Sequence, residues 1–141
     1  LVSSSAASDV YKRQLQSLLN ESSGKGYTFI ERIKKGIYGS QQYRIISIRN
    51  NNLSNEFSES SDIVYSNIEI RKKGISLHFR FKNEEYLDCC HFNKLKIMSN
   101  DNVLTLQIEN SIYKLQYKNP KQNNLLIKKI YNEKIYFNKE I

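Results

Sequence analysis

Apolar and polar side chains alternate along the middle of the chain, and this period of two predicts β-strands. The clearest run is ISLHFRF at positions 75–81. Its alternation places four apolar side chains on one face of a strand, which are Ile75, Leu77, Phe79 and Phe81. The opposite face carries Ser76, His78 and Arg80, and we expect these to face solvent.

Further segments of the same kind lie on both sides of this run. They are QQYRIISIRN at 41–50, IVYSNIEI at 63–70, EEYLDCCHF at 84–92, KLKIM at 94–98, VLTLQIE at 103–109 and SIYKLQY at 111–117. The last two are expected to form a hairpin. Its predicted core residues are Leu104, Leu106, Ile108, Tyr113, Leu115 and Tyr117.

Polar stretches separate these segments. RKKG at 71–74 and SNDN at 99–102 are predicted turns, with Gly74 free to adopt a positive φ. NNNLSNEFSESS, before residue 62, is predicted to be a long loop that holds a short strand around Phe57.

The apolar spacing changes to that of a helix at both ends of this region. Pro120 ends the strand pattern, and Asn123 is the expected cap of a helix over LLIKKIYNEKIYF. One side of this helix is expected to form a buried apolar stripe of Leu126, Ile127, Ile130, Tyr131 and Ile135. The charged residues Lys128, Lys129 and Glu133 are expected to face solvent. YTFIERIKKGIYG at 27–39 predicts a short basic helix that packs on the domain or, alternatively, lies on a membrane surface.

This order predicts an α+β domain that is mainly β. We expect a small, strongly bent antiparallel sheet or partial barrel, closed by a C-terminal α-helix and preceded by a short N-terminal helix. Residues 41–137 resemble the bacterial pleckstrin-homology-like (PH-like) domains, on the IEIRKKGISLHFRF hairpin, the EEYLDCCHFNKLKI strand pair and the terminal helix. The resemblance implies a non-catalytic binding or assembly module. SH3-like and lipocalin-like folds are the alternatives, because the segment before residue 62 is poor in strands.

The first fourteen residues, LVSSSAASDVYKRQ, differ in composition from the rest. They hold the only two alanines, Ala6 and Ala7, whereas Ile, Asn, Lys and Tyr dominate afterwards. SSSAASDVYKRQ resembles a translated sequencing-adapter scar, and we predict that residues 1–14 are not native. The alternative is a genuine flexible terminus. We divide the rest into a linker with a short helix at 15–40 and the PH-like domain with its helix at 41–141.

The chain carries a formal net charge of +8, from 22 Lys and Arg against 14 Asp and Glu. This charge favours a polyanion as partner, either an anionic membrane surface or, as the alternative, nucleic acid. The predominance of Lys over Arg also fits codon drift in an A/T-rich genome, because surfaces that read phosphates favour Arg. A protein partner therefore stays open.

Two observations indicate the compartment. No apolar run approaches the roughly 18 residues of a membrane-spanning helix. The adjacent cysteines, Cys89 and Cys90, are poor disulfide partners for each other and are expected to be reduced packing residues. We therefore expect a cytoplasmic protein.

The sequence lacks the common catalytic, phosphate-cradling and metal-binding motifs, so we expect no enzyme, cofactor or metal. The best candidate site is the RKKG turn, where Arg71, Lys72 and Lys73 could converge on one phosphate. Lys94 and Lys96 are predicted to extend this anion-binding patch along a neighbouring strand. In eukaryotic members of the family that the chain resembles, the corresponding loop binds phosphoinositide head groups. The alternative is a solvated turn.

Overall fold

The structure, a computed structural model, describes residues 2–4, 20, 21, 23, 24, 26, 30, 31, 40–50 and 52–139. The described strands are β1 (Val2–Ser4), β2 (Tyr43–Arg49), β3 (Tyr65–Ile70), β4 (Gly74–Phe81), β5 (Glu84–His91), β6 (Leu95–Asn100), β7 (Val103–Ile108) and β8 (Ser111–Gln116). The described helices are α3 (Ser54–Glu59), the short 3-10 helix η1 (Phe92–Lys94) and α4 (Pro120–Lys139). None of these helices is long and apolar enough to cross a membrane.

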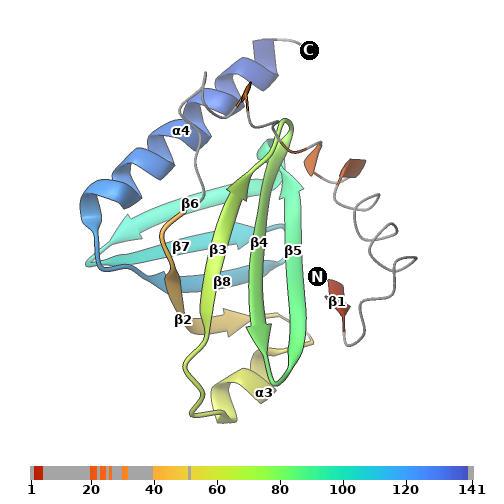
Figure 1. The fold of residues 1–141 in the computed structure, drawn as a ribbon, viewed down its shortest axis with the longest axis vertical. Coiled ribbons are helices and arrows are strands. Elements are labelled where there is room, and N and C mark those ends of the chain that lie inside the picture. The colour runs from red at the N-terminus through yellow and green to blue at the C-terminus, as the bar shows by residue number, and fades with distance from the viewer. Residues whose placement is uncertain are drawn as a thin grey trace.

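The strands form one antiparallel sheet that bends into two layers. Their order is β1-β5-β4-β3-β2-β8-β7-β6. β2 belongs to both layers, because it pairs with β3 through Tyr43 and Arg44 and with β8 from Arg44 to Arg49. A register shift between Ile45 and Ser47 marks a bulge, which bends the strand. Figure 1 shows β3, β4 and β5 running across β6, β7 and β8, with α4 along one end. The prediction of a bent antiparallel sheet with a C-terminal helix is confirmed.

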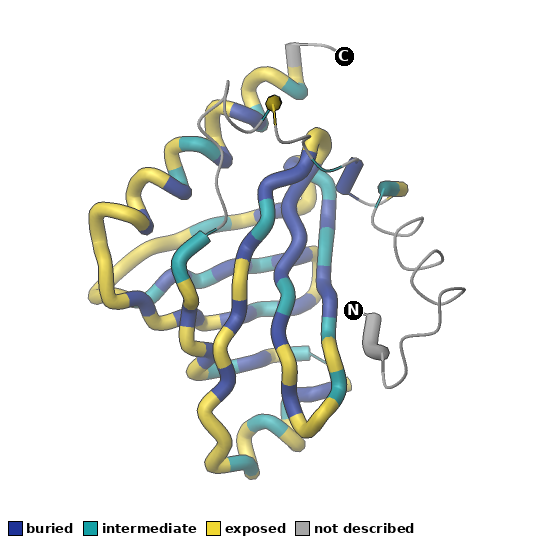
Figure 2. Tube along the Cα trace, viewed as in Figure 1, coloured by how far each residue is buried: buried dark blue, intermediate teal, exposed yellow. Residues whose placement is uncertain are grey.

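The hydrophobic core lies between these two layers. The apolar face predicted for β4 is buried, and so are all six core residues predicted for the last hairpin. Along β2, β3, β7 and β8 buried residues alternate with more exposed ones, as Figure 2 shows, whereas β4 is buried on both faces over most of its length. Period-two patterning identified the predicted core residues of β4 and of the last hairpin, because one face of these strands meets the other layer.

Two hairpin turns use left-handed backbone. Lys82 and Asn83 have φ of 50° and 65°, and Asp101 and Asn102 have φ of 50° and 63°. Two successive positive φ angles match the twist of the flanking strands. Gly74 does not share this conformation, so the predicted positive φ there was wrong. Glycine is needed at this position because a Cβ would collide with the backbone carbonyl oxygen of Cys90 on β5.

The polar loop after β2 holds a helix, α3, where we predicted a short strand around Phe57. The amide of Asn52 donates to Asn50 Oδ1 at 2.8 Å, and the amide of Asn50 donates to Ser54 Oγ at 2.7 Å. These local bonds favour a turn that continues into the helix. Phe57 packs on Phe81, with the ring centroids 5.7 Å apart.

α4 begins earlier than predicted. Asn119 caps it, since its Oδ1 accepts a hydrogen bond from the amide of Gln122 at 3.1 Å. Pro120 occupies the first helical position, where its missing N–H costs nothing. The prediction of Asn123 as the cap was therefore wrong, and this residue is fully buried inside the helix.

Most of the N-terminal predictions fall outside the described residues. This applies to the helix predicted at 27–39, apart from Ile30 and Glu31, and to most of residues 1–14. Within the segment predicted to be non-native, Val2–Ser4 forms β1 and pairs with β5.

Candidate docking surface

A buried hydrogen-bond network fixes the orientation of α4. Tyr43 Oη donates to Asn123 Oδ1 at 2.8 Å, and Asn123 Nδ2 donates to Ser99 Oγ at 3.0 Å. Burial raises the pKa of Tyr43 to about 12, so its hydroxyl remains a donor at neutral pH. Leu126 and Ile130 complete the inward face in the core. The network therefore sets which side of the helix faces solvent.

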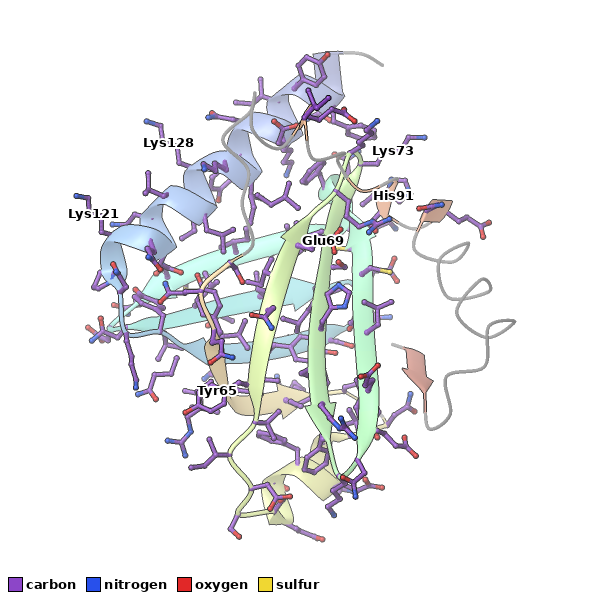
Figure 3. The ribbon with its side chains drawn as sticks, viewed as in Figure 1. Tyr65, Glu69, Lys73, His91, Lys121 and Lys128 are labelled. Atoms are coloured by element: carbon purple, nitrogen blue, oxygen red, sulfur yellow. The ribbon has the colours of Figure 1, made fainter. Side chains whose placement is uncertain are left out.

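The outward side of α4 combines lysines with apolar side chains. Positions spaced by three and four residues hold Lys121, Leu125, Lys128, Asn132 and Ile135, all of them exposed. Leu125 and Ile135 are 49% and 54% exposed. In Figure 3 the labelled Lys121 and Lys128 point away from the sheet. We call these five residues, together with the exposed Tyr136, the outer face of α4.

The sequence pattern misplaced this face by part of a turn. Tyr131 and Ile135 were predicted to be buried and are exposed, whereas Glu133 was predicted to be in solvent and is only 9% exposed. The reason is Asn123, whose network rotates the helix so that positions 123, 126, 130 and 133 face inward. Glu133 is the only acidic residue within α4, so the outer face of α4 carries no carboxylate.

The RKKG turn divides into a buried and an exposed part. Arg71 is only 3% exposed, and its guanidinium donates to Gly24 O at 2.7 Å, to Asn20 Oδ1 at 2.9 Å and to Glu69 Oε1 at 2.9 Å. Arg71 therefore does not share a surface with the two lysines that follow it. The expectation of three cations converging on one phosphate does not match this arrangement.

The four predicted lysines are all exposed, but they belong to different elements. Lys72 and Lys73 form the tip between β3 and β4, and Lys72 Nζ lies 3.4 Å from Glu31 Oε2. Lys94 lies in η1, and Lys96 lies on β6. η1 adjoins the tip, because the amide of Phe92 donates to Lys73 O at 3.0 Å. The predicted patch is thus a loose group around one end of the domain.

A serine, a histidine and a glutamate meet on the outer side of β3 and β4, without the geometry of a catalytic relay. Ser76 Oγ lies 2.8 Å from His78 Nε2, and Glu69 Oε2 lies 3.6 Å from the same nitrogen. A relay would need the serine and the carboxylate on opposite ring nitrogens. Burial lowers the pKa of His78 despite the nearby Glu69, and Ser76 is fully buried although we predicted it in solvent.

One open hollow lies between β2, α3 and the link that follows α3. Its volume is about 360 Å³. Its lining includes Arg44 and Ile46 from β2, Phe57 from α3, and the hydroxyl groups of Ser60 and Ser61. Sequence analysis missed this hollow because α3 was not predicted. No group of three or more His, Cys, Asp or Glu side chains in the described part of the chain is placed to hold a metal ion.

Comparison with known proteins gives no family assignment: no protein-family model matches the chain, and no curated protein matches its sequence.

Proposed function

We propose that this chain is a non-catalytic docking module that binds an anionic membrane surface through the outer face of α4. One observation carries the proposal: this face presents Lys121 and Lys128 on the same side of the helix as the exposed apolar side chains of Leu125 and Ile135, and α4 contributes no carboxylate to it. A helix that lies in a membrane interface combines the same features, because its lysines meet lipid phosphates while its apolar side chains enter the acyl boundary.

The expected affinity is modest. Each lysine close to an anionic leaflet contributes about 1 kcal/mol. Leu125 and Ile135 are about half exposed, so burying the rest of each adds about 1 kcal/mol. Lys121, Lys128 and these two side chains together supply about 4 kcal/mol. Such a module would bind reversibly and would need a second contact for stable residence.

We also propose that the domain is PH-like and cytoplasmic. The strand order supports the first point, since β3, β4 and β5 form one layer, β6, β7 and β8 form the other, β2 joins the two, and one helix follows them. The second is supported by Cys89 and Cys90, neither of which forms a disulfide, and the cytoplasmic leaflet is the anionic one. Many domains of the family that the chain resembles are binding or assembly modules.

The test is co-sedimentation of the whole chain with vesicles of phosphatidylcholine alone or mixed with phosphatidylserine. Lys121→Glu/Lys128→Glu is compared with Lys82→Glu/Lys114→Glu, which removes two exposed lysines outside α4 and changes the net charge equally. We expect the α4 variant to lose at least tenfold in affinity for anionic vesicles, and the control to stay within about twofold.

Three results would overturn the proposal. The first is the absence of binding to anionic vesicles at low salt. The second is an equal loss in both variants, which would mean that only net charge matters. The third is stronger binding to a single-stranded oligonucleotide competitor with a steep salt dependence, which would favour the nucleic-acid alternative.

A further inference from the structure

The tip between β3 and β4 is covered by residues from the N-terminal part of the chain. We call the described residues 20, 21, 23, 24, 26, 30 and 31 the strap. The amide of Lys73 donates to Ser23 O at 3.0 Å, and Gly26 forms an antiparallel bridge with Arg71. Ser23 is fully buried. The strap therefore packs directly on the tip.

The strap occupies the anion-binding edge of Arg71. Nε donates to Gly24 O at 2.7 Å and Nη2 to Asn20 Oδ1 at 2.9 Å. These two nitrogens lie along one edge of the guanidinium group, the kind of fork that binds the two oxygens of a phosphate. Both strap oxygens are neutral, and a charged phosphate is the stronger acceptor. A phosphate group is thus a competitor for this edge.

The strap also pairs with the next cation. Glu31 Oε2 lies 3.4 Å from Lys72 Nζ, and both side chains are partly exposed. While the strap is in place, Arg71 is buried and the charge of Lys72 is opposed. Displacement of the strap would release Lys72 and would expose the Nε and Nη2 edge of Arg71, while Nη1 stays paired with Glu69 Oε1 of β3 at 2.9 Å.

The uncovered cations would lie next to the last turns of α4. The Phe92 amide donates to Lys73 O, and the Phe92 ring packs on Phe137 of α4 with centroids 6.1 Å apart. Figure 3 shows Lys73 and His91 at the end of the domain where α4 terminates. A membrane that meets the outer face of α4 would therefore also approach the tip.

We infer that the strap is an intramolecular cover that keeps Arg71 and Lys72 from the membrane, and that an anionic bilayer displaces it. This inference rests on the proposed function and adds a way in which the binding to an anionic membrane is regulated. Because only the open form offers both cations to lipid phosphates, anionic lipid must favour opening, and opening must strengthen binding by the same factor. Each uncovered cation is expected to strengthen binding about fivefold.

Gly24 provides a way to open the strap without changing any charge. Its φ is +78°, and a Cβ there would lie 2.8 Å from the Lys73 backbone nitrogen. Gly24→Ala is therefore strained on both counts. Gly26→Ala is the matched control, since Gly26 has no positive φ and the nearest atom to its Cβ would be the end of a side chain, Glu69 Oε1 at 3.2 Å, rather than backbone. Glu31→Gln is a milder variant that releases Lys72 alone.

The experiment combines hydrogen exchange of the whole chain with the vesicle assay. We expect Gly24→Ala to exchange faster at the strap residues and to bind anionic vesicles about tenfold or more tightly. Gly26→Ala should stay within about twofold, and Glu31→Gln should gain about fivefold. In the parent protein, anionic but not neutral vesicles should speed exchange at the strap residues.

Two results would overturn the inference while leaving the proposed function intact. One is that Gly24→Ala speeds hydrogen exchange of the strap but does not bind anionic vesicles more tightly, while Lys121→Glu/Lys128→Glu still loses its binding to those vesicles. The other is hydrogen exchange at the strap residues of the parent protein that saturating anionic vesicles leave unchanged. If Gly24→Ala does not fold, the inference is tested with Glu31→Gln instead. An affinity of that variant for anionic vesicles equal to the parent's would contradict the inference. If the parent protein does not bind vesicles, the proposed function fails first.

Discussion

Removal of the Tyr113 hydroxyl should measurably weaken the contact between the two layers. Tyr113 is fully buried on β8, and its Oη donates to Asp88 Oδ2 on β5 at 2.6 Å. Asp88 is itself buried, and its Oδ1 accepts from the Cys89 amide at 3.0 Å. Burial raises the pKa of Tyr113 well above its ordinary value, so the hydroxyl is protonated and donates throughout the neutral range.

The cost of Tyr113→Phe follows from this geometry. The ring keeps its packing against Phe79, with centroids 6.1 Å apart, so the change removes the hydrogen bond alone. A hydrogen bond to a charged group contributes about 1.5–3 kcal/mol, and we expect a loss of about 2 kcal/mol. For a domain of this size each kcal/mol lowers Tm by roughly 3 °C, which gives about 6 °C.

The assay is thermal and urea unfolding at pH 7, followed by circular dichroism. Tyr117→Phe is the matched control, because Tyr117 Oη lies 3.0 Å from the neutral Ser99 Oγ and its loss should cost about 1 kcal/mol or less. The urea m-value should not change in either variant. A Tyr113→Phe protein as stable as the parent, or no less stable than Tyr117→Phe, would refute the reasoning.

Three further outcomes follow from the structure. Gly74→Ala should lower the free energy of unfolding by about 3 kcal/mol or more, seen as a lower urea midpoint, because its Cβ would meet the Cys90 carbonyl oxygen; a parent-like midpoint would contradict this. Asn123→Ala should cost about 2 kcal/mol in the same assay, since it leaves the buried Tyr43 hydroxyl without its acceptor; a neutral effect would show that the network does not hold α4. Burial raises the pKa of Cys90 from 9.0 and of Tyr43 from 10.0, in both cases to about 12 in the folded state. Stability is therefore full below pH 9 and should fall above it by up to about 1.4 kcal/mol per pH unit because of Cys90, with as much again above pH 10 because of Tyr43. Urea midpoints from pH 8 to 11 check this, and a flat profile would contradict it.

The sequence predicted the sheet well because strand signals are local. Alternation in ISLHFRF identifies the face that meets the other layer, and turn residues such as Asn83 end each run. The position of Gly74 was recognised, but its role depends on a neighbouring strand and could not be seen from the turn alone.

The candidate site could not be predicted from local sequence patterns, because it depends on contacts between residues that are far apart in the sequence. Arg71 and Gly24 are 47 residues apart, and the hydrogen bond between them turns an apparent surface cation into a buried one. The orientation of α4 likewise depends on the bond between Tyr43 and Asn123, which are 80 residues apart. The start of the helix, by contrast, could have been predicted from the local sequence Asn119-Pro120.

The most direct test of the docking proposal is the environment of the outer face of α4 on a membrane. The chain contains no tryptophan, so Leu125→Trp introduces a single fluorescent reporter. Ile63→Trp is the control, since Ile63 is 58% exposed and lies between α3 and β3 in the sequence, and Figure 1 shows α3 at the opposite end of the domain from α4. We predict that anionic vesicles shift the emission of the reporter at position 125 to the blue and that brominated lipids quench it, while the reporter at position 63 stays unchanged. An emission from Leu125→Trp that anionic vesicles leave unchanged, under conditions where the protein sediments with them, would contradict the account.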